Sequence, residues 1–103
     1  MSMKSQHQQT RKNSDDGKVY DWIYEFQEDP TEEIQTKLVQ HYEPLVQSLA
    51  RKFSRGQDHD DDLYQVGMIG LLAALRRFDD SFNRSFESFA VPTIVGEIKR
   101  FIR

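Results

Sequence analysis

The segment from Asp62 to Leu75 constrains the fold of this chain most strongly, because it is apolar on nearly every side of a helix. Its apolar run, residues 66–75, is ten residues long, about half of the roughly 20 residues that span a bilayer. We therefore expect a buried helix, which is either enclosed by its own domain or presents a second apolar face to another protein. Gly67 and Gly70 each destabilise a helix interior by roughly 1 kcal/mol relative to alanine, which is tolerable where a neighbouring backbone comes close.

The first half of the chain shows apolar residues at helical spacing. Residues 19–26 carry one apolar stripe, with Trp22 as a core candidate. A second helix is predicted to start from an N-cap at Asp29, which is followed by a proline and an acidic residue. Because Pro44 lacks an N–H donor, we expect this helix to kink or restart between residues 41 and 45.

The second half predicts two more helices and no strand-like alternation. The central helix is expected over about residues 60–78, and the last helix is expected to begin within residues 85–88. The fold class is therefore all-α, a small bundle of four to five helices. Residues 1–18 have almost no apolar side chains, so we expect a disordered tail there and one domain over 19–103. The helical pattern continues to the last residue, so we expect the domain to be truncated at its C-terminal end.

Composition argues against several functional classes. The chain has no cysteine, which excludes disulfides and fits a reducing, cytoplasmic location. The polar N-terminus lacks the apolar stretch of a signal peptide. No nucleophile and base pair, phosphate-binding glycine loop or zinc-ligand spacing is present, so we expect neither enzymatic activity nor a cofactor. A metal site at residues 58–62 is not favoured, because capping and helix-dipole roles explain these acidic residues.

Charge is distributed unevenly along the chain. Residues 19–62 carry four basic and eleven acidic groups, whereas residues 63–103 carry six basic and four acidic groups. The acidic segment should repel a phosphate backbone, and the basic segment could bind one. We therefore expect two kinds of partner, a protein and a nucleic acid.

Two motifs resemble those of a known family. The pattern DLxQxGxIGL at residues 62–71, followed by RFD at 77–79, is similar to conserved region 2.2 of the bacterial sigma-70 family. Residues 85–103 resemble region 2.3 running into region 2.4. The proline at 92 and the GEIKR run at 96–100 resemble the stress and sporulation branch, of sigma-B type. The resemblance covers residues 21–103, from region 1.2 to the start of region 2.4.

The resemblance implies a docking role for the central helix. In this family, region 2.2 binds the clamp-helix coiled coil of the β′ subunit of core RNA polymerase. The contact candidates carried over by position are Asp62, Gln65, Val66, Met68 and Leu72. Leu63, Ile69 and Leu71 are expected in the core instead. Housekeeping relatives are more polar at positions 66 and 68, although apolar side chains suit a docking helix.

The last third of the chain interleaves aromatic and basic side chains. Rings that stack on unpaired bases contribute roughly 1 to 3 kcal/mol each, and nearby cations hold the strand backbone. The resemblance implies that Phe89 stacks on a flipped base of the non-template strand of the -10 promoter element, and that Lys99 and Arg100 face the upstream edge of that element. Gly96 faces the same edge but has no side chain to read a base. The DNA-binding candidates are Arg84, Phe86, Phe89, Lys99, Arg100 and Arg103.

Two substituted positions and two phenylalanine rings limit this DNA role. Pro92 and Thr93 stand where housekeeping relatives have a tryptophan pair, so melting is expected to be weaker or more dependent on promoter sequence. Phe78 and Phe101 are explained equally well as core residues.

Together these patterns predict a general-stress sigma factor domain that binds core RNA polymerase and the -10 element and promotes transcription initiation. An anti-sigma factor kinase is a further expected partner, and neither a membrane nor a small-molecule substrate is expected. The alternative is a helical interaction module whose main role is to bind an anti-sigma factor. A third class, a helix-turn-helix repressor, requires a short turn and a recognition helix that the sequence does not show.

Overall fold

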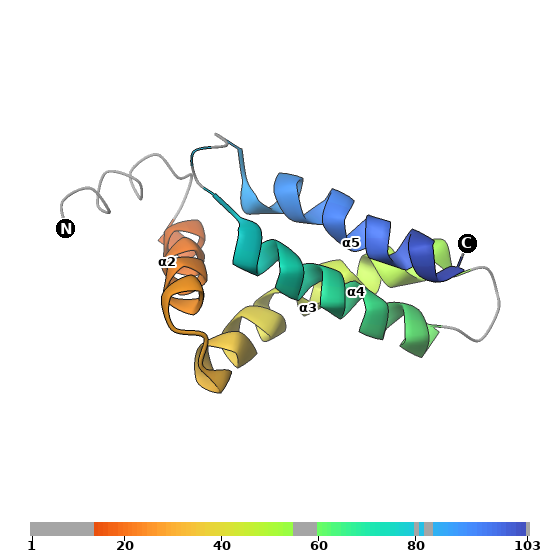
Figure 1. The fold of residues 1–103 in the computed structure, drawn as a ribbon, viewed down its shortest axis with the longest axis horizontal. Coiled ribbons are helices and arrows are strands. Elements are labelled where there is room, and N and C mark those ends of the chain that lie inside the picture. Colours follow the sequence, from red (N-terminus) through yellow and green to blue (C-terminus); the bar gives the residue numbers. More distant parts are fainter. Residues whose placement is uncertain (1–13, 55–59, 80, 82–83, 103) are drawn as a thin grey trace. The chain divides into compact units, whose positions relative to one another are not determined.

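The computed structural model describes residues 14–54, 60–79, 81 and 84–102, and within these ranges the chain forms helices and no strand (Figure 1). The all-α prediction is therefore confirmed. The helices are α2 (Ser14–Glu28), α3 (Glu32–Phe53), α4 (Asp60–Arg77) and α5 (Phe86–Ile102). The chain divides into two compact units, residues 1–38 and 39–103, and the division falls inside α3.

Helix α2, in the first unit, begins earlier than the sequence predicts. Residues 14–18 are helical and do not belong to a tail, whereas residues 1–13 lie outside the described ranges. The expected apolar stripe is confirmed, because Val19, Ile23 and Phe26 are buried. A helix that this stripe stabilises can propagate toward its N-terminus by one backbone hydrogen bond per residue. Trp22 is half-buried.

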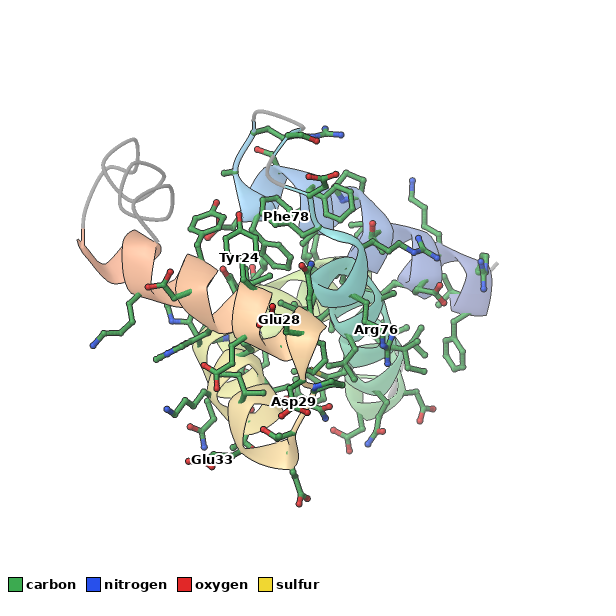
Figure 2. All side chains as sticks on the ribbon, turned by 60° about the vertical axis from the view of Figure 1, so that its left-hand side comes forward. Tyr24, Glu28, Asp29, Glu33, Arg76 and Phe78 are labelled. Atoms are coloured by element: carbon green, nitrogen blue, oxygen red, sulfur yellow. The ribbon has the colours of Figure 1, made fainter. Side chains whose placement is uncertain are left out.

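The N-cap of α3 is Thr31, two residues after the predicted one. The Thr31 Oγ1 atom accepts a hydrogen bond of 3.3 Å from the amide of Ile34, as an N-cap hydroxyl does. The amide of Asp29 instead closes α2 by donating to the carbonyl of Glu25 at 2.9 Å. Glu33, in the first turn of α3, complements the positive end of the helix dipole. Asp29 and Glu33 mark this turn in Figure 2.

Helix α3 continues through Pro44, so the predicted restart does not occur. Tyr42 and Val46, on either side of the proline, are both buried. Their burial stabilises the helical conformation and offsets the loss of the backbone hydrogen bond that Pro44 cannot donate.

Helices α4 and α5 lie side by side (Figure 1) and contact each other along their lengths. Gly70 sets the closest approach, since a Cβ built on it would lie 2.7 Å from the Cα of Ile94. The buried hydrophobic side chains of the pair are those of Leu63, Leu71, Ala74, Leu75, Phe86, Ala90, Ile94 and Ile98. The extent of α4 agrees with the predicted central helix.

The connection between α4 and α5 is organised by short polar contacts. The amide of Ser81 donates a hydrogen bond of 2.9 Å to Asp79 Oδ1, and this bond lowers the pKa of the Asp79 carboxyl. Ser85 caps α5, because its Oγ atom accepts a hydrogen bond of 3.2 Å from the amide of Ser88. The start of α5 at Phe86 confirms the predicted boundary.

Candidate functional site

One side of α4 faces solvent, and its residues are spaced alternately three and four positions apart. Residues at this spacing line up on a single face of a helix. We call this set the α4 outer face: Asp62, Gln65, Ile69, Leu72 and Arg76. Leu72 is half-buried and the other four residues are exposed. Figure 2 labels Arg76, at the C-terminal end of this face.

Ile69 corrects a prediction, because the sequence placed it in the core and 59% of its surface is exposed. Leu63 and Leu71, predicted with it, are indeed buried. Ile69 differs from Leu63 and Leu71 because the two glycines of α4 mark the side of the helix that packs against its neighbours. Gly67 and Gly70 are buried on the inner side of α4, and Ile69 lies opposite to that side.

All five predicted docking residues are accessible to some extent, but they do not form one line. Asp62, Gln65 and Leu72 belong to the α4 outer face. Val66 and Met68 are half-buried and flank that face on opposite sides. The sequence interpretation missed Ile69 and Arg76 as members of the face, although the alternating three- and four-residue spacing could have indicated both.

Tyr64 links α4 to α3. Its phenolic O–H donates a hydrogen bond of 3.1 Å to Glu43 Oε2. Burial raises the pKa of the Tyr64 phenol, and the hydrogen bond to Glu43 and the negative charge of Glu43 raise it further. This bond holds α4 against α3 beside the α4 outer face.

Phe86 corrects a second prediction, since its ring is fully buried and cannot stack on a base in this structure. The ring centre lies 4.9 Å from that of Tyr42 and 5.4 Å from that of Phe78. Phe78 is also buried, and Figure 2 labels it at the end of α4. Phe86 therefore belongs to an aromatic core that joins α3, α4 and α5.

Phe89 lies at the edge of this core and is half-buried. Its ring centre is 5.8 Å from that of Phe78. The guanidinium carbon of the exposed Arg84 also lies near this ring, 5.9 Å from its centre, within cation–π range. The structure thus brings together a partly accessible ring and a cation, two of the predicted DNA-binding residues.

The basic residues near the end of α5 are exposed. The Lys99 ammonium lies 6.0 Å from the centre of the Phe53 ring of α3, and Arg100 Nη2 lies 3.5 Å from Glu97 Oε1. Both cations are exposed and can reach a ligand, and the exposed ion pair of Arg100 with Glu97 is weak. Arg103 lies outside the described residues, as do the side chains of residues 58–60 from the acidic cluster. Phe101 is exposed and is not a core residue.

Residues 38–103 match the family model for sigma-70 region 2. The chain belongs to the sigma-70 region 2 family. The matched span agrees closely with the second compact unit, residues 39–103, and includes every residue discussed on α4 and α5. The expected resemblance is therefore confirmed.

Several sigma factors are similar to this chain over most of its length. The RNA polymerase sigma-B factor of Bacillus anthracis is 48% identical over 101 residues, which cover 98% of this chain and 38% of that protein. The sigma-B factor of Bacillus subtilis is 52% identical over 81 residues, covering 79% of this chain and 31% of that protein. The sigma-G factor of Bacillus subtilis is 39% identical over 79 residues, covering 77% and 30%.

This sigma-70 region 2 chain thus spans less than two fifths of the length of these curated relatives. Across the residues that the structure describes, no helix combines the length and apolar character needed to cross a membrane.

Proposed function

We propose that this chain is the part of a general-stress RNA polymerase sigma factor that binds core RNA polymerase through α4 and holds opened -10 promoter DNA on α5. The observation that carries this proposal is the exposed Ile69 at the centre of the α4 outer face, within a sigma-70 region 2 chain. An exposed isoleucine beside the half-buried Leu72, on a face with charged residues at both ends, is a candidate anchor for a partner.

The spacing of the α4 outer face favours a helical partner. Positions three and four apart in alternation form the seam that one helix presents to another in a coiled coil. The β′ clamp helices of core RNA polymerase are the helical partner that the family resemblance implies. Asp62 and Arg76, at the two ends of the face, carry opposite charges that can fix the orientation of the partner.

The accessible side of Phe89 supports the DNA role. A base that leaves the duplex can stack on a ring that is already held in place, and here Phe78 holds the Phe89 ring from the core side. Arg84, Lys99 and Arg100 supply exposed positive charge for the strand backbone. Function in this proposal is binding, and none of these residues is assigned a catalytic role.

The docking role is tested by the double substitution Gln65→Ala and Leu72→Ala, with core RNA polymerase and with isolated β′ clamp helices as ligands. We expect weaker binding to both while circular dichroism still shows a folded helical chain. The matched control is Glu87→Ala, an exposed position on α5. Unchanged affinity of the folded double variant would show that α4 does not dock there.

An anti-sigma factor kinase is the second proposed partner, and it rests on the sigma-B resemblance more than on a contact pattern. We expect it to compete with core RNA polymerase, partly through residues 38–62. This segment includes Glu43 and exposed charged residues such as Arg51 and Asp61. Size-exclusion chromatography of the three components tests this competition, and a stable ternary complex with undiminished affinities would contradict it.

A further inference from the structure

Four aromatic rings of the second compact unit contact one another in a row that ends at Phe89. The ring centre of Tyr42, on α3, lies 4.9 Å from that of Phe86. The centre of Phe86 lies 5.4 Å from that of Phe78, which lies 5.8 Å from that of Phe89. All three separations fall within the range of favourable aromatic pairs, and the pairs are tilted or edge-to-face. We call these four residues the ring row.

Burial changes at the end of the ring row. Tyr42, Phe86 and Phe78 are buried, with 4%, 0% and 3% of their surface exposed, whereas Phe89 is half-buried. Figure 2 labels Phe78, the ring that lies between the rest of the buried row and Phe89. Because protein interiors are close-packed, a buried ring changes its position only if its neighbours also move. On its core side, the Phe89 ring is therefore held by a row of three rings, of which Tyr42 is the most distant.

Tyr42 is the member of the ring row that lies far from the others in the sequence. Phe78 follows α4 directly, and Phe86 and Phe89 belong to the first turn of α5. These three rings are therefore carried by the two ends of one short connection. Tyr42 instead lies inside α3. Its ring thus connects α3 to the segment that carries Phe89, a link that local sequence does not supply.

We propose that Tyr42 is a positioning residue for promoter opening. Its ring supports Phe86 and Phe78, and through them it holds the Phe89 ring in the orientation in which an unpaired base can stack on it. A ring that is already held loses less conformational entropy when a base stacks on it. Tyr42 itself is buried, so it acts through the other rings. This inference rests on the proposed function and adds α3 to the elements that take part in DNA opening.

Two substitutions at position 42 separate the ring from the rest of the side chain. Tyr42→Leu keeps an apolar side chain at a buried site but removes the ring, whereas Tyr42→Phe keeps the ring and removes the hydroxyl. We expect Tyr42→Leu to lower open-complex formation by about 2- to 10-fold, the scale of one lost aromatic pair. Tyr42→Phe should stay within roughly twofold of the wild-type chain, because the ring contacts persist. Neither substitution should change the affinity for core RNA polymerase, because position 42 is buried.

Opening and stacking are measured on the complex of the chain with core RNA polymerase, with a promoter DNA that the wild-type complex selects from a randomised library. Permanganate reactivity of unpaired thymines reports opening. 2-Aminopurine, which replaces each adenine of the non-template -10 strand in turn, reports stacking, because its fluorescence is quenched where the base stacks on a ring. We expect this quenching to be weaker in Tyr42→Leu and to be restored in Tyr42→Phe.

Val46→Ala is the matched control, because it truncates a buried side chain of α3 that is not part of the ring row. Val46 is fully buried, one turn after Tyr42. Its truncation should lower the midpoint of thermal unfolding, as Tyr42→Leu also should, but it should leave opening and quenching unchanged. All variants are compared at a temperature at which circular dichroism shows them folded. If Tyr42→Leu does not fold, Tyr42→Met replaces it, since methionine fills irregular gaps without a ring.

Three results would overturn the proposal. Unchanged opening and quenching in Tyr42→Leu would show that the Phe89 ring does not depend on Tyr42. Equal losses of opening in Tyr42→Leu and Val46→Ala would make Tyr42 an ordinary core residue. A loss in Tyr42→Phe as large as that in Tyr42→Leu would assign the effect to the hydroxyl and not to the ring. Failure of the wild-type chain to bind core RNA polymerase or to open the DNA would instead contradict the proposed function, and it is recorded before any variant is compared.

Discussion

Gly70 lies so close to Ile94 that a Cβ on Gly70 would be 2.7 Å from the Cα of Ile94 and 3.2 Å from the carbonyl oxygen of Thr93. Both atoms belong to the backbone of α5, so no side-chain rotation can relieve the clash. We expect Gly70→Ala to lower the free energy of unfolding by about 1 to 3 kcal/mol, even though alanine favours the helix. Urea unfolding followed by circular dichroism measures this change.

Gly67→Ala provides the comparison for Gly70→Ala. Its added Cβ would lie 2.9 Å from Val46 Cγ1, a side-chain atom, which can move more easily than a backbone. The loss of stability should therefore be smaller than at Gly70. Equal losses at the two positions would contradict the assignment of Gly70 as the point where two backbones meet.

Ile69→Ala tests the central residue of the α4 outer face. Because 59% of Ile69 is exposed, its truncation should leave the unfolding midpoint nearly unchanged. We expect the affinity for core RNA polymerase to fall by about 1 to 2 kcal/mol, or roughly 5- to 30-fold. The control is Leu71→Ala, a fully buried neighbour, which should lower stability by about 2 to 5 kcal/mol. A loss of stability in Ile69→Ala as large as that of Leu71→Ala would place Ile69 in a packed environment.

Phe89→Ala separates DNA stacking from core packing. We expect open-complex formation to fall roughly 5- to 150-fold, since a stacked base contributes about 1 to 3 kcal/mol, while binding to core RNA polymerase persists. Permanganate reactivity of unpaired thymines, measured with the complex of the chain and core RNA polymerase, reports the opening.

Phe86→Ala is the matched control for Phe89→Ala, because the Phe86 ring is fully buried. Truncation of a buried ring should lower stability by about 3 to 5 kcal/mol and abolish all activities together. If Phe89→Ala lost stability and core binding in the same way, the Phe89 ring would be a core residue only.

The hydrogen bond between Tyr64 and Glu43 predicts a pH effect. Burial and Glu43 raise the pKa of Tyr64 above its ordinary value of 10.0, so the folded state holds this proton more tightly than the unfolded state. The stability that Tyr64 contributes is therefore fully present below about pH 10 and is lost as the pH rises through the folded pKa. In Tyr64→Phe this loss should be absent, so the difference in unfolding free energy between wild type and variant should shrink above pH 10. A difference that stays constant over this range would contradict the raised pKa.

The helical elements were predictable because their signals are local. The apolar segment of the sequence indicates the extent of α4, and the serine that caps α5 indicates where that helix begins, each to within a few residues. The N-cap of α3 was predicted two residues too early, because Asp29 and Thr31 are both good capping residues. Only the structure shows that the Thr31 hydroxyl accepts the hydrogen bond from the backbone amide of the first turn.

The surfaces were harder to predict because they depend on which side of a helix is buried. An almost wholly apolar helix gives no polar face to identify its outer side, so Ile69 and Leu71 could not be separated by hydrophobicity. Phe86 recurs with Ala90, Ile94 and Ile98 at four-residue spacing, a pattern that would have assigned it to the core. The roles in docking and DNA binding stay predictions.

The contact of Gly70 with the backbone of α5 has a mechanical consequence. Most helix pairs are separated by a layer of side chains, which can change rotamers and absorb a small displacement. At Gly70 that layer is absent. We therefore expect a displacement of α4 at this position to move the backbone of α5 directly. A partner that binds the Ile69 side of α4 is thus expected to influence the position of the Phe89 ring as well.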